Sequence, residues 1–75
     1  MARPKRRYVV CLSNDGYAAS LERGKIYVAL DDAEAHSEGF VRVIDESGED
    51  YLYPTRRFAD IELPRKIARA LSTPA

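Results

Sequence analysis

Aromatic and arginine side chains are the residues of this sequence best suited to bind a partner. Five rings can hold a cationic group by cation–π attraction, or stack on an unpaired base: those of Tyr17, Tyr27, Phe40, Tyr51 and Tyr53. Arg56 and Arg57 are adjacent, and two neighbouring guanidinium groups suit bidentate capture of a phosphate or a carboxylate. Because aromatic residues and arginine commonly anchor protein interfaces, we predict one contact surface made by Tyr17, Phe40, Tyr51, Arg56 and Arg57.

The same residue types also have a purely structural interpretation. Aromatic residues in strands, such as Tyr53, commonly pack in the core or in cross-strand pairs. Arg56 and Arg57 can instead form ion pairs with the acidic segment 45–50, each exposed pair contributing about 0–1 kcal/mol. The acids of that segment would also repel a polyanion such as a nucleic acid.

The sequence lacks the residue patterns of an enzyme or a metal site. Cys11 lies in an apolar run without a His or Lys beside it to lower its pKa, so we expect a small buried residue. The segment 31–39 holds four acids and His36, but not the alternating ligands, central glycine and closing glutamate of a calcium loop. We expect this segment to be a solvated surface loop, and we expect no catalysis and no cofactor.

Composition and charge narrow the class of protein. The 75 residues are 45% hydrophobic and 32% charged, which indicates one small folded domain. No apolar run approaches the roughly 20 residues of a membrane-spanning helix, and a single cysteine permits no intrachain disulfide, so we expect a cytoplasmic protein without a membrane partner. The net charge is zero, but 31–50 contains eight acidic residues against one basic residue. This segregation argues against a uniformly basic nucleic-acid binder and leaves a dipolar surface.

Short alternating apolar runs separated by turn residues predict five β-strands, which lie between a basic N-terminal arm and a helical C-terminal tail. Polar turns interrupt the runs, and in the acidic hairpin Gly48 is expected to supply the positive φ. The three predicted segments are a basic arm (1–7), a barrel domain (8–63) and a short helical tail (64–75). Within the barrel domain we expect strands at 8–12, 25–30, 40–44, 51–53 and 58–63, and a tight 3₁₀ turn at 54–57.

Five short strands in so small a chain predict a small all-β barrel, because closure removes the edges that would otherwise pair between molecules. Alternation within each strand selects the side chains that face inward, although a slip of one residue inverts a strand. The predicted core is Val10, Leu12, Leu21, Ile26, Val28, Leu30, Val41, Val43, Tyr53, Phe58 and Ile61.

In the tail, the spacing of the apolar residues changes from that of a strand to that of a helix. Pro64 suits the first helical position, and Ile67 and Leu71 recur at helical spacing among basic residues. So short a helix is not stable alone, so we expect it to dock on the open end of the barrel. The alternative is a homodimer in which two copies bury these apolar residues between them.

The stretch 21–63 resembles an SH3-like barrel in the order and spacing of its turns. Leu21 to Ile26 resembles that family's bend into the second strand, Ser47 and Gly48 fall at its distal hairpin, and Pro54 to Phe58 falls on its proline-led 3₁₀ turn. The resemblance implies the fold and not a function.

Two departures from that family concern its proline-rich ligands. The chain has no Trp, so Phe40 stands where SH3 domains place a tryptophan, and Arg57 stands where they place a turn tyrosine. Binding of ordinary proline-rich peptides is therefore not expected. The chain, especially Asp45 to Pro54, also resembles a group of short bacterial proteins without an assigned activity, which implies no chemistry.

We therefore predict a non-enzymatic binding or regulatory module that contacts a partner protein through Tyr17, Phe40, Tyr51, Arg56 and Arg57. The alternative is single-stranded nucleic-acid binding through the basic arm, the two adjacent arginines and the basic tail. The sequence alone does not name the partner.

Overall fold

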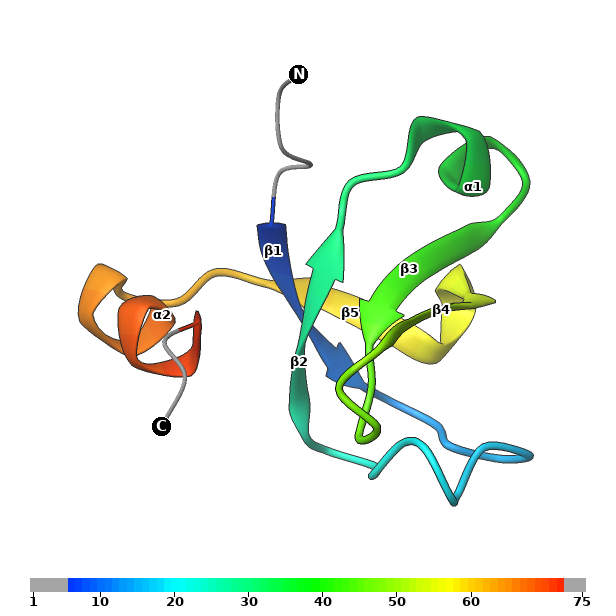
Figure 1. Cartoon of the computed structure of the whole chain (residues 1–75), viewed down its shortest axis with the longest axis horizontal. Helices are drawn as coiled ribbons and strands as arrows, with labels where there is room; N and C mark the ends of the chain where they lie inside the picture. The colour runs from blue at the N-terminus through cyan, green and yellow to red at the C-terminus, as the bar shows by residue number, and fades with distance from the viewer. Residues whose placement is uncertain (1–5, 73–75) are drawn as a thin grey trace.

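The structure is a computed structural model that describes residues 6–72 of the chain, and strands make up most of it (Figure 1). Short helical elements lie between strands and at the end of the described chain. In chain order the elements are β1 (Arg6–Cys11), β2 (Ile26–Leu30), α1 (Ala33–Ser37), β3 (Phe40–Ile44), β4 (Asp50–Pro54), the 3₁₀ helix η1 (Thr55–Arg57), β5 (Phe58–Ile61) and α2 (Arg65–Ser72).

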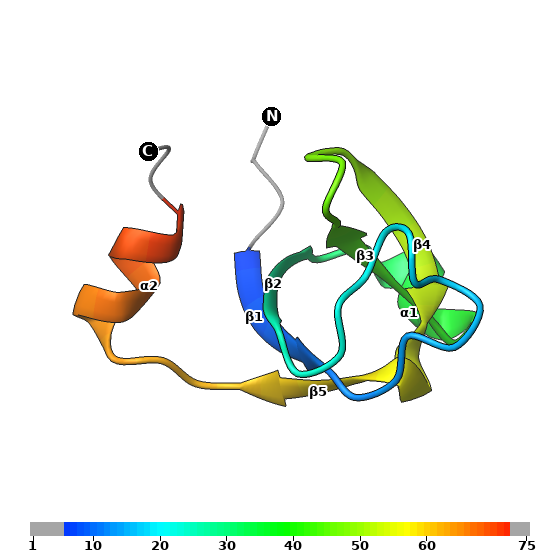
Figure 2. The ribbon, with the colours of Figure 1, turned by 90° about the horizontal axis from the view of Figure 1, so that it is seen from below.

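The five strands form one antiparallel sheet in the order β4-β3-β2-β1-β5. The sheet is strongly curved (Figure 2), and its buried apolar residues form one cluster. Its edge strands β4 and β5 do not pair with each other, so the sheet stays open. The predicted all-β class and the five strands are confirmed, whereas closure of the sheet into a barrel is not observed. None of the helices within residues 6–72 is long and apolar enough to cross a bilayer.

The inward face of β1 is the reverse of the predicted one. Val9 and Cys11 are buried in the core, whereas Val10 is only half-buried and Leu12 is 50% exposed. The run from Tyr8 to Leu12 is apolar at every position, so alternation alone does not distinguish its two faces. The prediction that Cys11 is buried is confirmed, and burial raises the pKa of its thiol.

The same inversion occurs in β2. Tyr27 and Ala29 face the core, while Ile26 is exposed and Val28 and Leu30 are half-buried. Ala29 is fully buried where β2 is flanked by β1 and β3. A small residue fits that crowded position, whereas the larger side chains of β2 fit the open outer face.

The predicted core of the second half of the chain is largely correct. On the buried face of the sheet, Val41 of β3 pairs with Tyr53 of β4. Val43, Phe58 and Leu21 are buried with them. Ile61 is the exception in this half, because it is only half-buried near the end of β5. Gly48 has a φ of 84°, so the expected positive φ in the acidic hairpin is confirmed.

The segment 31–39 contains a helical turn, which corrects the prediction of a loop. The side chain of Asp32 caps α1 by accepting a hydrogen bond from the backbone N–H of Ala35 at 3.0 Å. The guanidinium of Arg42 also donates to Asp32, which ties α1 to β3. The capping bond and the Arg42 contact hold the pKa of the Asp32 carboxyl below its usual range.

Both ends of the described chain differ from the predictions. β1 begins at Arg6, so the last two residues of the predicted basic arm belong to the sheet, and residues 1–5 lie outside the described part. The helix after Pro64 is present as α2, but it stands beside the sheet rather than docking on it (Figure 2). Ile67 is 48% exposed on α2, so the expected docking is not observed.

Candidate functional site

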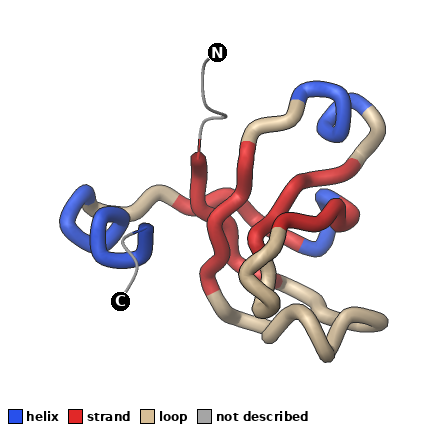
Figure 3. Tube along the Cα trace, in the orientation of Figure 1, coloured by secondary structure: helices blue, strands red, loops and turns tan. Residues whose placement is uncertain are grey.

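A groove of about 280 Å³ opens between the loop that follows β1 and the hairpin that joins β3 to β4. These two loops lie at one end of the sheet, opposite α1 (Figure 3). Three of the residues that line the groove are tyrosines, one is a serine and one is a carboxylate. They are Tyr17, Ser20, Asp45, Tyr51 and Tyr53.

The three tyrosine rings are in contact, and Tyr53 is the central one. Its ring centroid lies 5.0 Å from that of Tyr17, with the two planes at 88°. The ring of Tyr51 lies 5.5 Å away on another side and is tilted by 54°. Such edge-to-face and tilted pairs contribute about 0.5–1.5 kcal/mol beyond the area that they bury. Tyr53 is fully buried and Tyr51 is 62% exposed, so the rings run from the core to the surface.

The hydroxyl of Tyr53 connects the two walls of the groove. It lies 2.6 Å from Oδ2 of Asp45 in the hairpin and 3.0 Å from the hydroxyl of Ser20 in the loop. The hydroxyl of Ser47 and the hydroxyl of Tyr53 hold the pKa of the Asp45 carboxyl below its usual range. Burial and the neighbouring Asp45 raise the pKa of Tyr53. At neutral pH the groove therefore contains an ionised carboxylate and a neutral phenol.

Backbone hydrogen bonds hold the wall that carries Tyr17. The carbonyl of Tyr17 accepts from the N–H groups of Ser20 and Leu21, at 2.9 and 2.8 Å. The N–H of Glu46 in the hairpin donates to the carbonyl of Ser20 at 3.0 Å, so loop and hairpin are joined directly. The shape of the groove is thus set by bonds between segments that are far apart in the sequence.

A second set of contacts fixes Glu46, the residue that follows Asp45 in the hairpin. Its carboxylate accepts from Nζ of Lys25 at 2.6 Å and from the hydroxyl of Tyr27 at 2.6 Å. Lys25 and then Tyr27 lower the pKa of this carboxyl, while burial and Glu46 raise the pKa of Tyr27. Tyr27 therefore supports the hairpin from the core and does not line the groove.

Three of the five residues predicted from the sequence lie near one another. Tyr17 and Tyr51 line the groove. Arg57 does not line it, but its guanidinium lies 5.7 Å from the centroid of the Tyr17 ring and donates to the hydroxyl of Ser13 at 2.8 Å. Arg57 therefore holds Tyr17 in place through a cation–π contact instead of facing the groove.

The other two predicted residues lie elsewhere. In the pairing of β3 with β4, Val43 faces Tyr51 and Phe40 faces Pro54, so alternation places Phe40 on the side of the sheet opposite the tyrosines. Arg56 is exposed on η1 and has no hydrogen bond or ion pair with any residue of 6–72. The expected ion pairs of the two adjacent arginines with the acidic hairpin are likewise not formed within the described chain.

Three residues of the groove were missing from the predicted surface, namely Ser20, Asp45 and Tyr53. Ser20 and Asp45 both lie at bends of the chain, where serine and aspartate are expected for their turn-forming side chains. Nothing in their local sequence distinguishes a groove residue from a turn residue. Tyr53 was expected in the core, and it fulfils both roles because its ring is buried and its hydroxyl points to the groove.

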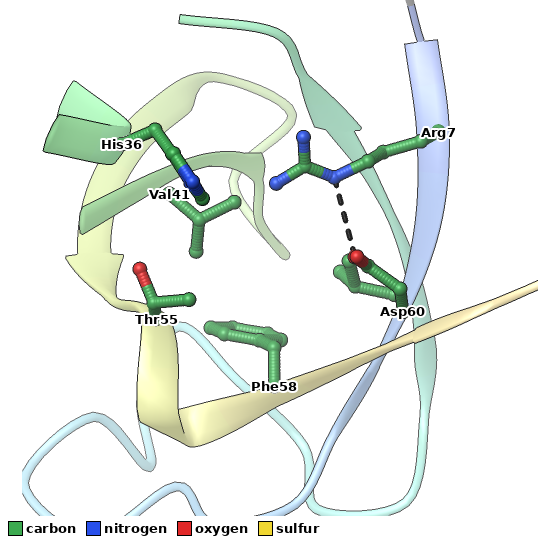
Figure 4. Close-up of a pocket in the computed structure, with 7 residues that line it drawn as sticks. Arg7, His36, Val41, Thr55, Phe58 and Asp60 are labelled. Carbon is green, nitrogen blue, oxygen red and sulfur yellow. Dashed lines mark ion pairs between the residues drawn. The ribbon is translucent and has the colours of Figure 1, made fainter. Parts of the chain in front are cut away.

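A smaller pocket of about 80 Å³ lies beside α1, at the other end of the sheet (Figure 4). Its floor is apolar and its mouth is polar. Nε of Arg7 lies 3.2 Å from Oδ1 of Asp60 in an ion pair that lacks hydrogen-bond geometry. The lining residues are Arg7, Val9, His36, Val41, Thr55, Phe58 and Asp60.

This smaller pocket does not suit a substrate. Ligand pockets usually measure about 300–1,000 Å³, so 80 Å³ has room for a few water molecules only. Water would satisfy the Thr55 hydroxyl, which is buried without a hydrogen-bond partner in residues 6–72. Within the same part of the chain, no group of three or more His, Cys, Asp or Glu side chains is arranged to hold a metal ion.

The tyrosine groove is therefore the candidate site: it is larger than the pocket beside α1, it is lined by aromatic rings and one carboxylate, and it opens to solvent at Tyr51. Comparison of the chain with known protein families, with curated proteins and with solved structures gives no match.

Proposed function

We propose that this chain is a non-enzymatic binding module that receives a segment of a partner protein in the tyrosine groove. One observation carries the proposal: the ring of Tyr51 is 62% exposed and lies against the buried ring of Tyr53 at the mouth of a groove. Exposed tyrosines that are fixed by a rigid base are typical anchors of protein interfaces, because little side-chain freedom is lost on binding.

We further propose that the module has an SH3-like architecture with an open sheet. The strand order, the 3₁₀ helix between β4 and β5 and the long loop after β1 support this proposal. The groove lies between that long loop and the hairpin at 45–49. Phe40 stands where SH3 domains place a tryptophan of their peptide-binding surface, but it lies on the opposite side of the sheet from Tyr51 and Tyr53. The tyrosine groove is therefore a different surface from the one that SH3 domains use.

Binding, rather than catalysis, is favoured by the state of the possible nucleophile. The thiol of Cys11 is buried and its pKa is raised, whereas a nucleophilic cysteine is accessible and has a lowered pKa. The imidazole of His36 belongs to the small pocket beside α1, at the other end of the sheet from the groove.

A site-specific photo-crosslink tests the proposal. A photoreactive phenylalanine analogue replaces Tyr51 in one sample and Phe40, an exposed aromatic on the opposite face, in the matched control. We expect a covalent adduct with a partner polypeptide from position 51 and none from position 40. The purified partner is then titrated with the Tyr51→Ala variant, for which we expect about tenfold weaker binding. Equal adducts from both positions, or unchanged affinity of the variant, would refute the proposal.

The second candidate function is binding of single-stranded nucleic acid. It is favoured by Arg56, whose charge is exposed and unpaired within residues 6–72, next to Arg57 on a rigid turn. It predicts an affinity that falls steeply between about 50 and 200 mM salt, because bound phosphates release counterions. Absence of binding at the lower salt concentration would eliminate this function.

A further inference from the structure

We propose that the tyrosine groove binds a cationic side chain, a lysine or an arginine, of the partner polypeptide. This inference rests on the proposed function and specifies its ligand. The three rings of Tyr17, Tyr51 and Tyr53 meet at centroid distances of 5.0 and 5.5 Å around Tyr53. The ring of Tyr51 is 62% exposed in this groove, and a cation within about 6 Å of a ring face is attracted.

The carboxylate in the groove adds a charge of the complementary sign. Asp45 lines the groove and is ionised at neutral pH. It accepts hydrogen bonds from Ser47 and Tyr53, but it forms no ion pair with any cation of the described chain. Glu49, four residues farther along the same hairpin, also forms none within residues 6–72. The charge of Asp45 in the groove, and that of Glu49 in the same hairpin, thus have no positive partner within residues 6–72.

Lys25 and Arg42 already form ion pairs with carboxylates other than that of Asp45. Lys25 lies 2.6 Å from the carboxylate of Glu46, and Arg42 lies 2.8 Å from that of Asp50. Arg57 contacts Tyr17 but is not part of the groove lining. Asp45 is therefore the charged residue in the groove lining, and its carboxylate favours a cationic ligand over a phosphate or a carboxylate.

The size of the groove fits one long side chain. Its volume of about 280 Å³ lies just below the range of about 300–1,000 Å³ that holds a whole small molecule. Tyr51 and Tyr53 belong to β4, which is an edge strand of the sheet. An edge leaves backbone groups free to pair with an extended chain, so a polypeptide can place its side chain in the groove while its backbone follows β4.

Blocked amino acids test this inference directly. The full chain, labelled with ¹⁵N, is titrated with Nα-acetyl-lysine methylamide, with the arginine analogue, and with the Nε-acetylated lysine compound as the neutral control. We expect the cationic probes to shift the amide signals of Tyr17, Ser20, Asp45 and Tyr51. We expect the neutral control to bind about tenfold more weakly, because it keeps the aliphatic stem and loses the charge.

Variants of Tyr51 locate the binding without disturbing the core. Tyr51→Phe keeps the ring and should bind the lysine probe as the native chain does. Tyr51→Leu keeps an apolar side chain but loses the ring, and we expect about fivefold weaker binding. The matched control Phe40→Leu removes an exposed ring from the opposite face and should leave the affinity unchanged. Amide spectra of each variant verify that the fold is retained.

Three results would overturn the inference. They are equal binding of the neutral control, shifts confined to residues outside the groove, and loss of affinity in Phe40→Leu but not in Tyr51→Leu. The outcome is separable from that of the proposed function. A partner that crosslinks at position 51 while the cationic probes fail to bind would leave the module intact and refute only the cationic ligand.

Discussion

The hydroxyl of Tyr53 lies 2.6 Å from Oδ2 of Asp45, and this contact joins the buried aromatic core to the acidic hairpin. The same hydroxyl lies 3.0 Å from the hydroxyl of Ser20, so one phenol connects both walls of the groove. Because the ring is fully buried and the hydroxyl faces the groove, Tyr53 couples the stability of the fold to the shape of the candidate site.

Tyr53→Phe should destabilise the chain while keeping the ring packing. A hydrogen bond to a charged group contributes about 1.5–3 kcal/mol, so we expect a loss of that size in the free energy of unfolding in urea. The pKa of Asp45 should rise, because one of the two hydroxyl donors that lower it is removed. Carbon-detected NMR titration of the carboxyl measures this shift. In the control Tyr51→Phe the removed hydroxyl has no hydrogen bond within residues 6–72, and neither quantity should change.

Stability should fall in acid. Three carboxyl groups, those of Asp32, Asp45 and Glu46, have a lowered pKa in the folded chain because each accepts hydrogen bonds. The donors, larger effect first, are the N–H of Ala35 and Arg42 for Asp32, Ser47 and Tyr53 for Asp45, and Lys25 and Tyr27 for Glu46. A carboxyl group whose pKa is lower in the folded than in the unfolded chain stabilises the fold at every pH above its unfolded pKa. This stabilisation is lost as the pH falls through the folded pKa. We therefore expect a constant midpoint of urea unfolding above about pH 5 and a decline below about pH 4.

Two variants assign that decline to particular groups. Asp45→Asn and Glu46→Gln each remove a carboxyl that must be protonated in acid, so each should flatten part of the pH dependence. A native profile that stays level to about pH 3 would contradict the assignment.

The orientation of β2 is testable with a pair of matched substitutions. Ala29 is 0% exposed, so Ala29→Leu should overpack the core and cost about 1–3 kcal/mol of unfolding free energy. Val28 is half-buried on the outer face, and Val28→Leu should change stability by no more than about 0.5 kcal/mol. Thermal and urea unfolding of the two variants give the comparison. The opposite ranking would mean that Val28 and not Ala29 faces the core.

The helix α2 should open more readily than the sheet. It has only eight residues, and the side chain of Ile67 is 48% exposed, so tertiary packing of that residue contributes little to the helix. We expect the amide protons of α2 in dilute protein to exchange much faster than those of β1 and β3. The homodimer hypothesis makes a different prediction, since a second copy that covers Ile67 would slow the exchange as the protein concentration rises. Ile67→Glu would then abolish that concentration dependence.

Local structural features were predictable where the sequence of a few adjacent residues is compatible with only one local conformation. The placement of Val41 and Val43 on either side of Arg42 indicated the inward face of β3, and Gly48 in an acidic turn indicated the positive φ of the hairpin. Pro64 marked the start of the helical tail one residue before α2 begins. Each of these features depends on a few adjacent residues, and tertiary contacts did not change them.

The orientation of β1 and β2 could not be predicted, because both faces of these strands are apolar. Packing decided which face of β2 turns inward. Ala29 fits between the neighbouring strands β1 and β3, and the hydroxyl of Tyr27 forms a hydrogen bond with Glu46 of the hairpin. α1 was also missed, because its stability depends on Arg42 of β3 as well as on its own cap at Asp32.

The residue types of the candidate site were evident in the sequence, but only the tertiary structure decided which of them meet. Tyr17 and Tyr51 are brought together because the loop after β1 bonds to the hairpin through the carbonyl of Ser20. Phe40 is separated from them because the register of β3 with β4 places it on the opposite face. Local propensity and alternation are properties of neighbouring residues, whereas strand register and the meeting of loops depend on contacts between distant ones.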